Sequence, residues 1–461
     1  MRTLVLLIAL QLLSPVIWAK KRTYTRPNFI VIYTDDQQYN GVGYTGNDII
    51  NTPFIDKLAS KSLKFTNANV AFALCSPSRA AMLTGRYNSA NGVLQLNSKL
   101  NKGEVSVASL LKEAGYSTAM TGKWHIPQKP KQLGFDFFSY MYSNGTYYNR
   151  QFFEEGDTLK PAIHCDLYAA NKAKEYLNKK AKKDEPFFLY YCAQTPHMNG
   201  KLIWDAKGET KAQYDYKDMP VPANHADDLS DKPEYLKKVR NRRQAKKYGY
   251  PDSTAIQKHA LDYYSVITEL DGFVEGLIKE VKSLGLLDNT YIFFMSDNGW
   301  MVGDHGFTSK VLPYRPASHV PFFVLGPGIK KNTESNTMVS NIDIAPTMLD
   351  LAGVSVPDYM HGKSLKDVLT QKESVVRDIF IYEGVGKYGG SRPNLTAISD
   401  DYRLIITYKD ETLKEESFRE LYHQKKDKWE MTNLASNPEY ASVVRKLESD
   451  IKKHKIEVLG M

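Results

Sequence analysis

Four short runs of consecutive hydrophobic residues are spread widely along the chain. Because every position in each run is apolar, without the polar alternation of a half-exposed strand, the pattern predicts parallel strands that are buried on both faces. The runs occupy residues 29–33, 187–192, 291–295 and 320–325.

Helical patterns lie between these runs. Thr52 and Pro53 form an N-cap followed by a proline at the first helical position, which predicts a helix over 54–60. A second predicted helix spans 105–114, and a third, with apolar residues at helical spacing, spans 255–284. Strands that alternate with helices predict an α/β fold whose sheet is covered by helices on both faces.

The pattern changes near residue 375. Shorter strand-like runs at 379–382, 395–399 and 402–408 precede a final helix, which opens at Asn437-Pro438 and carries an apolar stripe. We therefore predict a large α/β domain over 20–375. A small C-terminal α+β subdomain with an antiparallel sheet should follow over 376–461.

The first nineteen residues have the features of a signal peptide. Arg2 supplies the positive start, residues 4–13 form an apolar run, and Trp18-Ala19 is a plausible cleavage site. No cysteine lies near that site for lipid attachment, and no other run approaches the ~20 apolar residues of a membrane helix. We expect export to the periplasm or the exterior, without stable membrane insertion.

Composition and charge narrow the class of protein. Hydrophobic residues at 42% and charged residues at 25% are typical of a globular protein and exclude a disordered one. The formal charge of +9 becomes +8 when Arg2 is removed with the signal peptide, so anionic partners are favoured. Nucleic acid, acidic lipid and sulfated glycan all qualify on charge alone. The three cysteines are too few for a disulfide scaffold, although Cys165 and Cys192 could pair.

Polar residues follow three of the hydrophobic runs. Asp35-Asp36 follow the first, His197 lies beyond the second, and Asp297-Asn298 follow the third. Because ligands bind beyond the carboxyl ends of the strands in open α/β sheets, these segments can converge on one site. Each acidic pair alone is more typical of a turn, but both together favour an oxygen-liganded cation such as Ca²⁺ or Mg²⁺.

A cysteine motif and two basic motifs add candidate chemistry. Cys75 precedes Pro77 and Arg79, and proline suits a first helical turn, so Cys75 should lie at a helix N-terminus that favours an anion. Lys123 and His125 follow a strand-like segment; if that segment stays extended, both side chains project to the same face. A buried structural cysteine or surface basic residues are the alternative interpretations of these motifs.

Taken together, these residues resemble the formylglycine-dependent, type I sulfatases of the alkaline-phosphatase-like superfamily, in particular bacterial polysaccharide sulfatases. The segment from Cys75 to Arg79 fits the C-x-P-x-R signature of the family, and residues 122–125 fit its second signature. Further matches follow in the family order at Asp35-Asp36, Thr52 to Asp56, Thr195 to His197, Asp297 to Gly299, Lys310 and Asn433 to Ala435. The resemblance covers about residues 27 to 436. It implies an alkaline-phosphatase-like fold with a mixed, mostly parallel central sheet.

The resemblance also implies a cofactor and a modification. A formylglycine-generating maturation enzyme would oxidise Cys75 to formylglycine, whose hydrate is the nucleophile. One Ca²⁺ per chain is implied, with the modified Cys75 among its ligands. The other implied ligands of the cation are Asp35, Asp36, Asp297 and Asn298.

Five further residues receive catalytic roles from the resemblance. Arg79 would stabilise the formylglycine hydroxyls, and Lys123 and Lys310 would bind the sulfate oxygens. His125 is the implied base that releases sulfate from the intermediate, and His197 is the implied acid that protonates the leaving alcohol.

The sequence favours a sulfated polysaccharide or its oligosaccharides as the substrate, such as ulvan, carrageenan or a glycosaminoglycan. Positive charge, 30 tyrosines and a basic run within 237–247 support this choice, although that run is also typical of a solvated helix face. The rival hypotheses are a phosphatase or phosphodiesterase of the same superfamily, and a glycan-binding protein without catalysis. His319, where many relatives have arginine, and residues 388–393 depart from the family pattern and bear on substrate choice.

Overall fold

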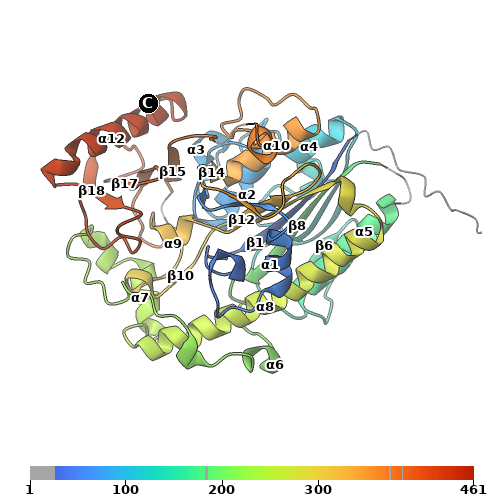
Figure 1. The fold of residues 1–461 in the computed structure, drawn as a ribbon, viewed down its shortest axis with the longest axis horizontal. Coiled ribbons are helices and arrows are strands. Elements are labelled where there is room, and N and C mark those ends of the chain that lie inside the picture. The colour runs from blue at the N-terminus through green and yellow to red at the C-terminus, as the bar shows by residue number, and fades with distance from the viewer. Residues whose placement is uncertain (1–25, 182–184, 373–374, 387) are drawn as a thin grey trace, which may run out of the picture.

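The computed structural model describes residues 26–181, 185–372, 375–386 and 388–461 (Figure 1). The predicted signal peptide over 1–19 lies outside these residues. Within the described ranges, no helix combines the length and the apolar character that crossing a bilayer requires.

A ten-stranded sheet forms the centre of the large unit, with β1 (Asn28–Asp35) in its middle. On either side, β8 (Phe187–Pro196) and β9 (Thr290–Ser296) pair with β1 in parallel. The parallel part continues through β4 (Ser117–Lys123) to β5 (Phe137–Met141). The first three hydrophobic runs are therefore parallel strands, as predicted.

The fourth run was predicted in the wrong direction. It forms β12 (Phe322–Leu325), which pairs antiparallel with both β9 and β2 (Leu63–Phe65). All four residues of β12 are buried, so the hydrophobic run reported burial on both faces correctly but carried no information on strand direction. The outer strands of the sheet are β13 (Thr333–Ser335), β6 (Phe152–Glu154) and β7 (Thr158–Leu159).

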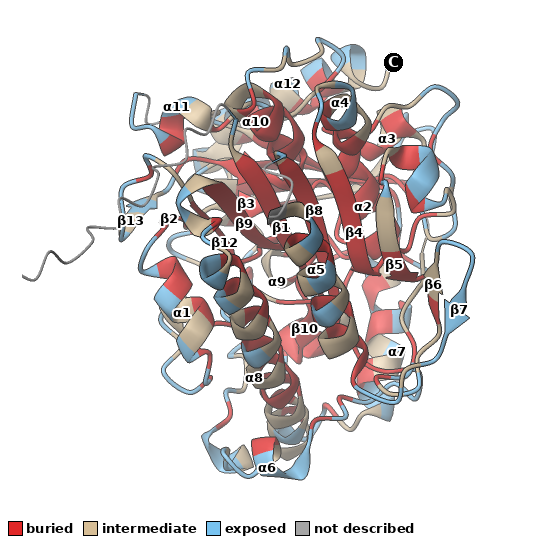
Figure 2. Cartoon of the chain, turned by 90° about the vertical axis from the view of Figure 1, so that its right-hand side faces the viewer, coloured by how far each residue is buried: buried red, intermediate tan, exposed pale blue. Residues whose placement is uncertain are grey.

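Helices cover both faces of the sheet, as predicted (Figure 2). Successive side chains of β1 point to opposite sides, so Phe29 and Val31 enter one hydrophobic core while Ile30 and Ile32 enter the other. The first core includes side chains of α2 (Cys75–Thr84), α4 (Val107–Glu113) and α10 (Ile344–Leu351). The second includes those of α1 (Pro53–Ala59), α5 (Cys165–Ala181) and α8 (Ser253–Ser283).

The N-terminus of α1 is capped by a side chain that is distant in the sequence. Pro53 is the first residue of α1, as predicted, but the Thr52 side chain does not cap the helix. The buried carboxylate of Asp271 on α8 instead accepts hydrogen bonds from the N–H groups of Phe54 and Ile55, at 3.1 and 2.7 Å. The start of α1 is thereby fixed by a helix more than two hundred residues away.

The C-terminal unit has a separate antiparallel sheet of β15 (Phe380–Gly384), β16 (Asn394–Ile398), β17 (Tyr402–Tyr408) and β18 (Glu416–His423). Its core is closed by α12 (Ala441–Glu457), which contributes the predicted apolar stripe. No strand was predicted at β18, because charged residues interrupt its hydrophobic pattern. The boundary near residue 375 stays a prediction.

Further short strands and helices lie between the main elements. They are β3 (Ala68–Asn69), β10 (Met301–Val302), β11 (Thr308–Ser309), β14 (Val339–Ser340), α3 (Asn88–Asn91), α6 (Gly208–Lys211), α7 (Arg240–Lys247), α9 (Arg315–Ser318) and α11 (Lys366–Leu369).

The considered disulfide between Cys165 and Cys192 is not formed, and both cysteines are free and buried. Cys165 belongs to the core on the α5 side of the sheet, whereas Cys192 belongs to the core on the opposite side. The sheet separates the two sulfur atoms, so no side-chain rotation brings them together.

Candidate active site

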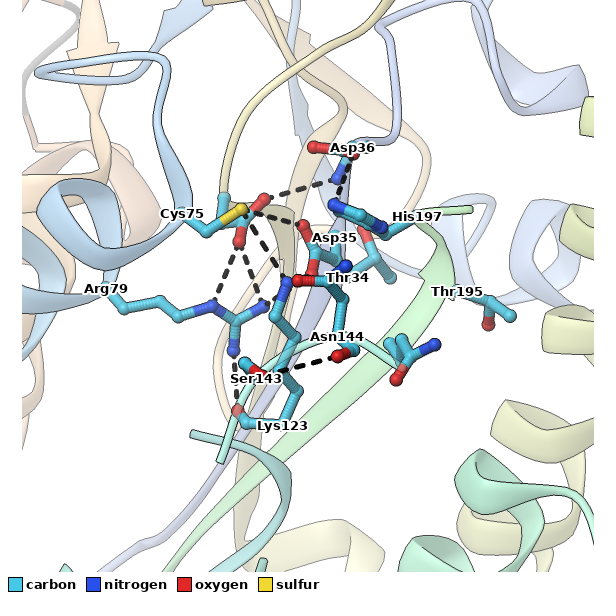
Figure 3. Close-up of polar contacts among 12 residues, drawn as sticks. Thr34, Asp35, Asp36, Cys75, Arg79, Lys123, Ser143, Asn144, Thr195 and His197 are labelled. Atoms are coloured by element: carbon cyan, nitrogen blue, oxygen red, sulfur yellow. Dashed lines mark hydrogen bonds and ion pairs between the residues drawn. The ribbon is translucent and has the colours of Figure 1, made fainter. Parts of the chain in front are cut away.

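The predicted site residues converge at the carboxyl ends of the central strands (Figure 3). Asp35 ends β1, Lys123 ends β4, and Cys75 is the first residue of α2, as its proline-containing motif predicted. One ligand atom from each of four buried residues lies within 4.8 Å of the others. These residues are Asp35, Asp36, Cys75 and Asp297.

The Cys75 thiol lies between acidic and basic groups. Its Sγ donates to Asp35 Oδ1 at 3.3 Å and lies 2.7 Å from Lys310 Nζ and 3.6 Å from Lys123 Nζ. Burial, reinforced by the negative charge of Asp35, raises the pKa of the Cys75 thiol to about 12. An unmodified Cys75 is therefore a neutral thiol at physiological pH, which is a poor nucleophile.

Arg79 lies one helical turn beyond Cys75 and is held rigidly. Its Nε and Nη2 each lie 2.9 Å from Asp297 Oδ2, and its Nη1 donates to the carbonyl oxygen of Lys123 at 2.7 Å. Burial disfavours the charged guanidinium, but Asp297 and Asp35 outweigh this effect and keep the pKa of Arg79 well above its usual value. In Figure 3, Arg79 and His197 approach the centre from opposite sides.

The two predicted lysines also contact the acidic groups. Lys123 Nζ pairs with Asp35, and Lys310 Nζ pairs with Asp36. Both lysines are buried, so each contact replaces lost hydration with a charged partner. Together with Arg79, three basic side chains contact the three acids of the cluster.

The oxygen atoms at the centre fit a hard cation. Asp36 Oδ2 and Asn298 Oδ1 are buried and accept no hydrogen bond from the described part of the chain. Burial and the nearby Asp35 carboxylate raise the pKa of Asp297 to about 7, because like charges crowd the pocket. A divalent cation with oxygen ligands relieves this repulsion, and oxygen is the donor that Ca²⁺ prefers. The residues that could hold it are Asp35, Asp36, Asp297 and Asn298.

The hydrogen bonds and burial of the two histidines set their protonation states. His197 Nδ1 donates to the carbonyl oxygen of Met198 at 2.7 Å, so Nε2 carries the free lone pair, 3.6 Å from Asp36 Oδ2. Burial and the nearby Lys123 lower the pKa of His197 to about 3, and the same causes hold that of His125 well below its usual value. Both imidazoles are therefore neutral while the site lacks substrate.

The chain is not extended from Lys123 to His125, so the condition under which both side chains would project to the same face is not met. The strand ends at Lys123, and His125 has a left-handed backbone with φ 60°. The chain turns there because the N–H groups of Trp124 and His125 donate to the carbonyl oxygens of Met141 and Tyr142. Such a turn depends on the neighbouring strand, so spacing along the sequence did not predict it.

Comparison with known proteins identifies the family. A family model described as Sulfatase matches residues 27–354, which is most of the chain. The chain belongs to the sulfatase family. A second family model, described as N-sulphoglucosamine sulphohydrolase, C-terminal, matches residues 303–457. The predicted family is thus confirmed, and the protein is an enzyme that hydrolyses sulfate esters.

Characterised relatives of this sulfatase share nearly its whole length. An N-acetylglucosamine-6-O-sulfatase of Bacteroides thetaiotaomicron is 29% identical over 96% of this chain and 89% of its own. An ulvan-active sulfatase of Formosa agariphila is 27% identical over 95% of this chain and 82% of its own.

Solved structures confirm the predicted fold class. A protein in complex with its substrate, D-glucosamine-2-N,6-O-disulfate, superposes with a TM-score of 0.84 at 26% identity, over 93% of this chain and 97% of its own. A phosphonate monoester hydrolase from Silicibacter pomeroyi reaches a TM-score of 0.78 at 19% identity, over 94% and 96% of the two chains. The fold therefore does not by itself distinguish sulfur from phosphorus chemistry.

Two aromatic residues of the candidate site had not been predicted. Tyr263 on α8 donates to the carbonyl oxygen of Asp36 at 2.6 Å and accepts from the N–H of Gln38 at 2.9 Å, so it fixes the turn after β1. Trp300 lies beside both His197 and Lys310, with 6.0 Å between ring centroids and 5.7 Å from ring to Nζ. Tyr263 had the pattern of a core residue, whereas the position of Trp300 directly after the Asp297 motif was a usable signal.

Proposed function

We propose that this sulfatase removes sulfate from a sulfated polysaccharide or its oligosaccharides, with formylglycine at position 75 and one bound Ca²⁺. The observation that carries the proposal is the position of Cys75. It is the first residue of α2, lies between two lysines, and is close to buried oxygen atoms that accept no hydrogen bond from the described residues. Burial keeps the thiol neutral, which makes it a poor nucleophile, whereas a hydroxyl of its oxidised and hydrated form can attack sulfur.

The chain's own residues supply the remaining functions. When bound, Ca²⁺ provides positive charge for a sulfate oxygen, and hydrated formylglycine provides the attacking oxygen. Lys123 and Lys310 flank Cys75 from two directions and bind the other sulfate oxygens, where negative charge increases in the transition state. Arg79 orients the modified residue from the helix that carries it.

The histidines move protons on opposite sides of the sulfur. His125 takes the proton whose loss releases sulfate and restores the aldehyde, and its neutral state suits a base. His197 delivers a proton from Nε2 to the leaving sugar oxygen. Because His197 is neutral in the free enzyme, it must gain this proton as the anionic substrate enters and raises its pKa.

Relatives and charge support the substrate class. The relatives named above act on N-acetylglucosamine-6-sulfate and on ulvan by their names, and another similar solved structure contains a carrageenan oligosaccharide. The net positive charge of this chain favours polyanionic substrates. The signal-like residues 1–19 support export to the periplasm or exterior, where such polysaccharides are encountered.

Mass spectrometry of the peptide that spans Cys75, combined with sulfate release from a glycan panel, tests the proposal. The protein is expressed with a formylglycine-generating enzyme, and the panel holds oligosaccharides of ulvan, carrageenan and heparin with the matching phosphate esters. We expect formylglycine and sulfate release from at least one glycan. Faster cleavage of phosphate esters supports the phosphatase alternative, and glycan binding without release supports a binding protein.

A further inference from the structure

Two segments that have no role in the proposed mechanism lie together in the structure. The basic run ends in α7, and the second segment starts at Tyr388. The N–H of Arg240 donates to the carbonyl oxygen of Gly389 at 2.8 Å, and its Nη1 donates to the Tyr388 hydroxyl at 2.7 Å. The Arg240 guanidinium also lies over the Tyr388 ring, 5.5 Å from the centroid. Two unassigned parts of the sequence therefore form one surface.

This surface adjoins the candidate active site. Asn241 on α7 donates from Nδ2 to the carbonyl oxygens of Thr308 and Lys310, each at 2.8 Å, so α7 supports the segment that carries Lys310. At the other end of α7, the Tyr248 hydroxyl lies 3.8 Å from Met198 Sδ, next to His197. The helix thus spans the rim of the site between Lys310 and His197.

One side of α7 carries unpaired positive charge. Arg240, Arg243 and Lys247 are exposed and spaced i, i+3, i+7, so they share one face of the helix. Arg242 points to the other side and donates to the carbonyl oxygen of His305. We call the three exposed residues the α7 stripe; at 1.5 Å per residue it extends over about 10 Å.

The α7 stripe has no acidic partner in the described part of the chain. Arg240 bonds Tyr388, and Arg243 donates to the backbone carbonyl oxygen of Lys238. No carboxylate lies within ion-pair distance of any of the three side chains among these residues. By contrast, nearby Lys237 pairs with Glu234 at 2.8 Å. The stripe is therefore free to bind an anion from solution.

We infer that the α7 stripe and Tyr388 form a subsite for the anionic groups of sugar units adjacent to the one whose ester is cleaved. Guanidinium groups bind two oxygens of a sulfate or carboxylate at once, and Tyr388 holds the Arg240 guanidinium in place through its ring and its hydroxyl. Several such groups at fixed intervals match a chain of charged sugars better than a single anion. This inference rests on the proposed function and specifies a substrate longer than a monosaccharide.

Binding to a non-reacting enzyme tests the subsite. The Cys75→Ser protein is titrated calorimetrically with heparin and ulvan tetrasaccharides and with the monosaccharide D-glucosamine-2-N,6-O-disulfate. We expect at least one tetrasaccharide to bind about tenfold more tightly than the monosaccharide. The added variant Arg240→Gln/Arg243→Gln/Lys247→Gln should lose that advantage, while its monosaccharide affinity changes little. At 1 M salt the advantage should disappear, because the screening length falls to about 3 Å.

A matched control separates a local subsite from net charge. Arg445→Gln/Lys446→Gln/Lys452→Gln on α12 removes the same number of positive charges away from the site and should keep the full tetrasaccharide advantage. Arg240 also anchors Tyr388, so the triple variant could act by moving that side chain. The double variant Arg243→Gln/Lys247→Gln leaves Arg240 in place, and it should lose about half of the logarithm of the tetrasaccharide-to-monosaccharide affinity ratio.

Two outcomes overturn the subsite. In the first, the tetrasaccharides and the monosaccharide bind with equal affinity. In the second, the α7 and α12 variants lose the tetrasaccharide advantage to the same extent. Failure of the proposed function looks different: the matured wild-type enzyme then releases no sulfate from any saccharide, whatever the binding difference between the variants.

Discussion

The centre of the candidate active site and the α7 rim use positive charge in opposite ways. In the centre, Arg79 and Lys123 are fully buried and contact the carboxylates of Asp297 and Asp35. On the rim, Arg243 and Lys247 are exposed and form no ion pair within the described ranges. Buried charge is costly unless a partner compensates it, so each residue of the centre depends on several others. An exposed charge is stabilised by its hydration and needs no ion-pair partner.

This contrast explains why the centre produces recognisable motifs and the rim does not. The identity and spacing of residues around Cys75 are restricted by hydrogen bonds to specific atoms. A solvated basic face tolerates many arrangements, and thus the same run is typical of both a binding surface and an ordinary helix. We expect changes in the centre to reduce turnover and changes on the rim to reduce affinity. Three predictions test the centre, and a fourth tests the packing beneath the rim.

The largest effect is expected from Cys75→Ser. Serine keeps the shape of the side chain but lacks the thiol that maturation oxidises, so kcat should fall by roughly 10³-fold or more. Sulfate release by the purified protein measures the loss. Cys165→Ala is the matched control, since this buried cysteine lies outside the site and should cost stability without comparable loss of kcat. Activity of Cys75→Ser within tenfold of wild type contradicts the proposed nucleophile.

His197→Gln should have a large effect that depends on the leaving group. For a sugar sulfate, loss of the proton donor should reduce kcat by about 10²- to 10⁴-fold. An aryl sulfate whose phenol leaves without protonation should lose far less. Comparing the two substrates in the same variant measures the role directly. Equal losses with both substrates contradict the assignment of His197 as the acid.

Removal of Ca²⁺ should abolish activity and lower stability. A ligand held at about 100 times its dissociation constant stabilises the folded state by about 3 kcal/mol, so chelation should lower Tm measurably. Asn298→Ala removes an oxygen that accepts no hydrogen bond within the described part of the chain, and it should raise the Ca²⁺ concentration needed for half-maximal activity about tenfold. Excess Ca²⁺ should restore the variant. If chelation changes neither activity nor Tm, the cation site is wrong.

The smallest of the four effects is a pH dependence of the free energy of unfolding, caused by Glu420 in the packing next to α7. Glu420 is buried and accepts hydrogen bonds from the hydroxyls of Tyr314 and Tyr422, two residues of the hydrophobic cluster that also contains Val239, next to α7. Burial raises its pKa from 4.5 to about 7. The folded state therefore holds a proton that the unfolded chain releases between these values, and stability falls as pH rises through this range.

Urea unfolding at pH 5 and pH 8 measures the Glu420 contribution. Between these pH values, Glu420 should lower the free energy of unfolding by about 3 kcal/mol. This value follows from the rise of its pKa from 4.5 to about 7, at 1.36 kcal/mol for each pKa unit. Glu420→Gln should remove this contribution, whereas Glu416→Gln on the same strand, where the carboxylate is partly exposed and paired with Arg419, should leave the decrease in place. An unchanged decrease in Glu420→Gln contradicts the assignment.

Much of the fold and of the centre was predictable because burial leaves a local signal. Runs such as 29–33 specify strands buried on both faces, and the polar residues that follow them mark the carboxyl edge of the sheet. The hydrophobic pattern did not predict the direction of β12, because that direction depends on the path of the connecting chain. The pattern also did not predict β18, where charged residues hide the strand.

Within the site, the cysteine motif predicted the start of α2 but not the backbone of His125. The position of Cys75 follows from residues a few places away, including Pro77, whose preference is intrinsic. The turn at His125 follows from hydrogen bonds to Met141 and Tyr142 on and beyond the neighbouring strand. Local preference can be read along the chain, whereas a contact between strands requires the sheet.

The sequence alone determined the family, the buried central strands and the set of residues that meet at their ends, because hydrophobic runs and a short motif encode these features locally. Only the tertiary structure decided that Asp271 caps α1, that Cys165 and Cys192 lie on opposite faces of the sheet, and that Arg240 meets Tyr388. Each of these relations joins residues remote along the chain. Their proximity results from the packing of whole elements, for which no local pattern exists.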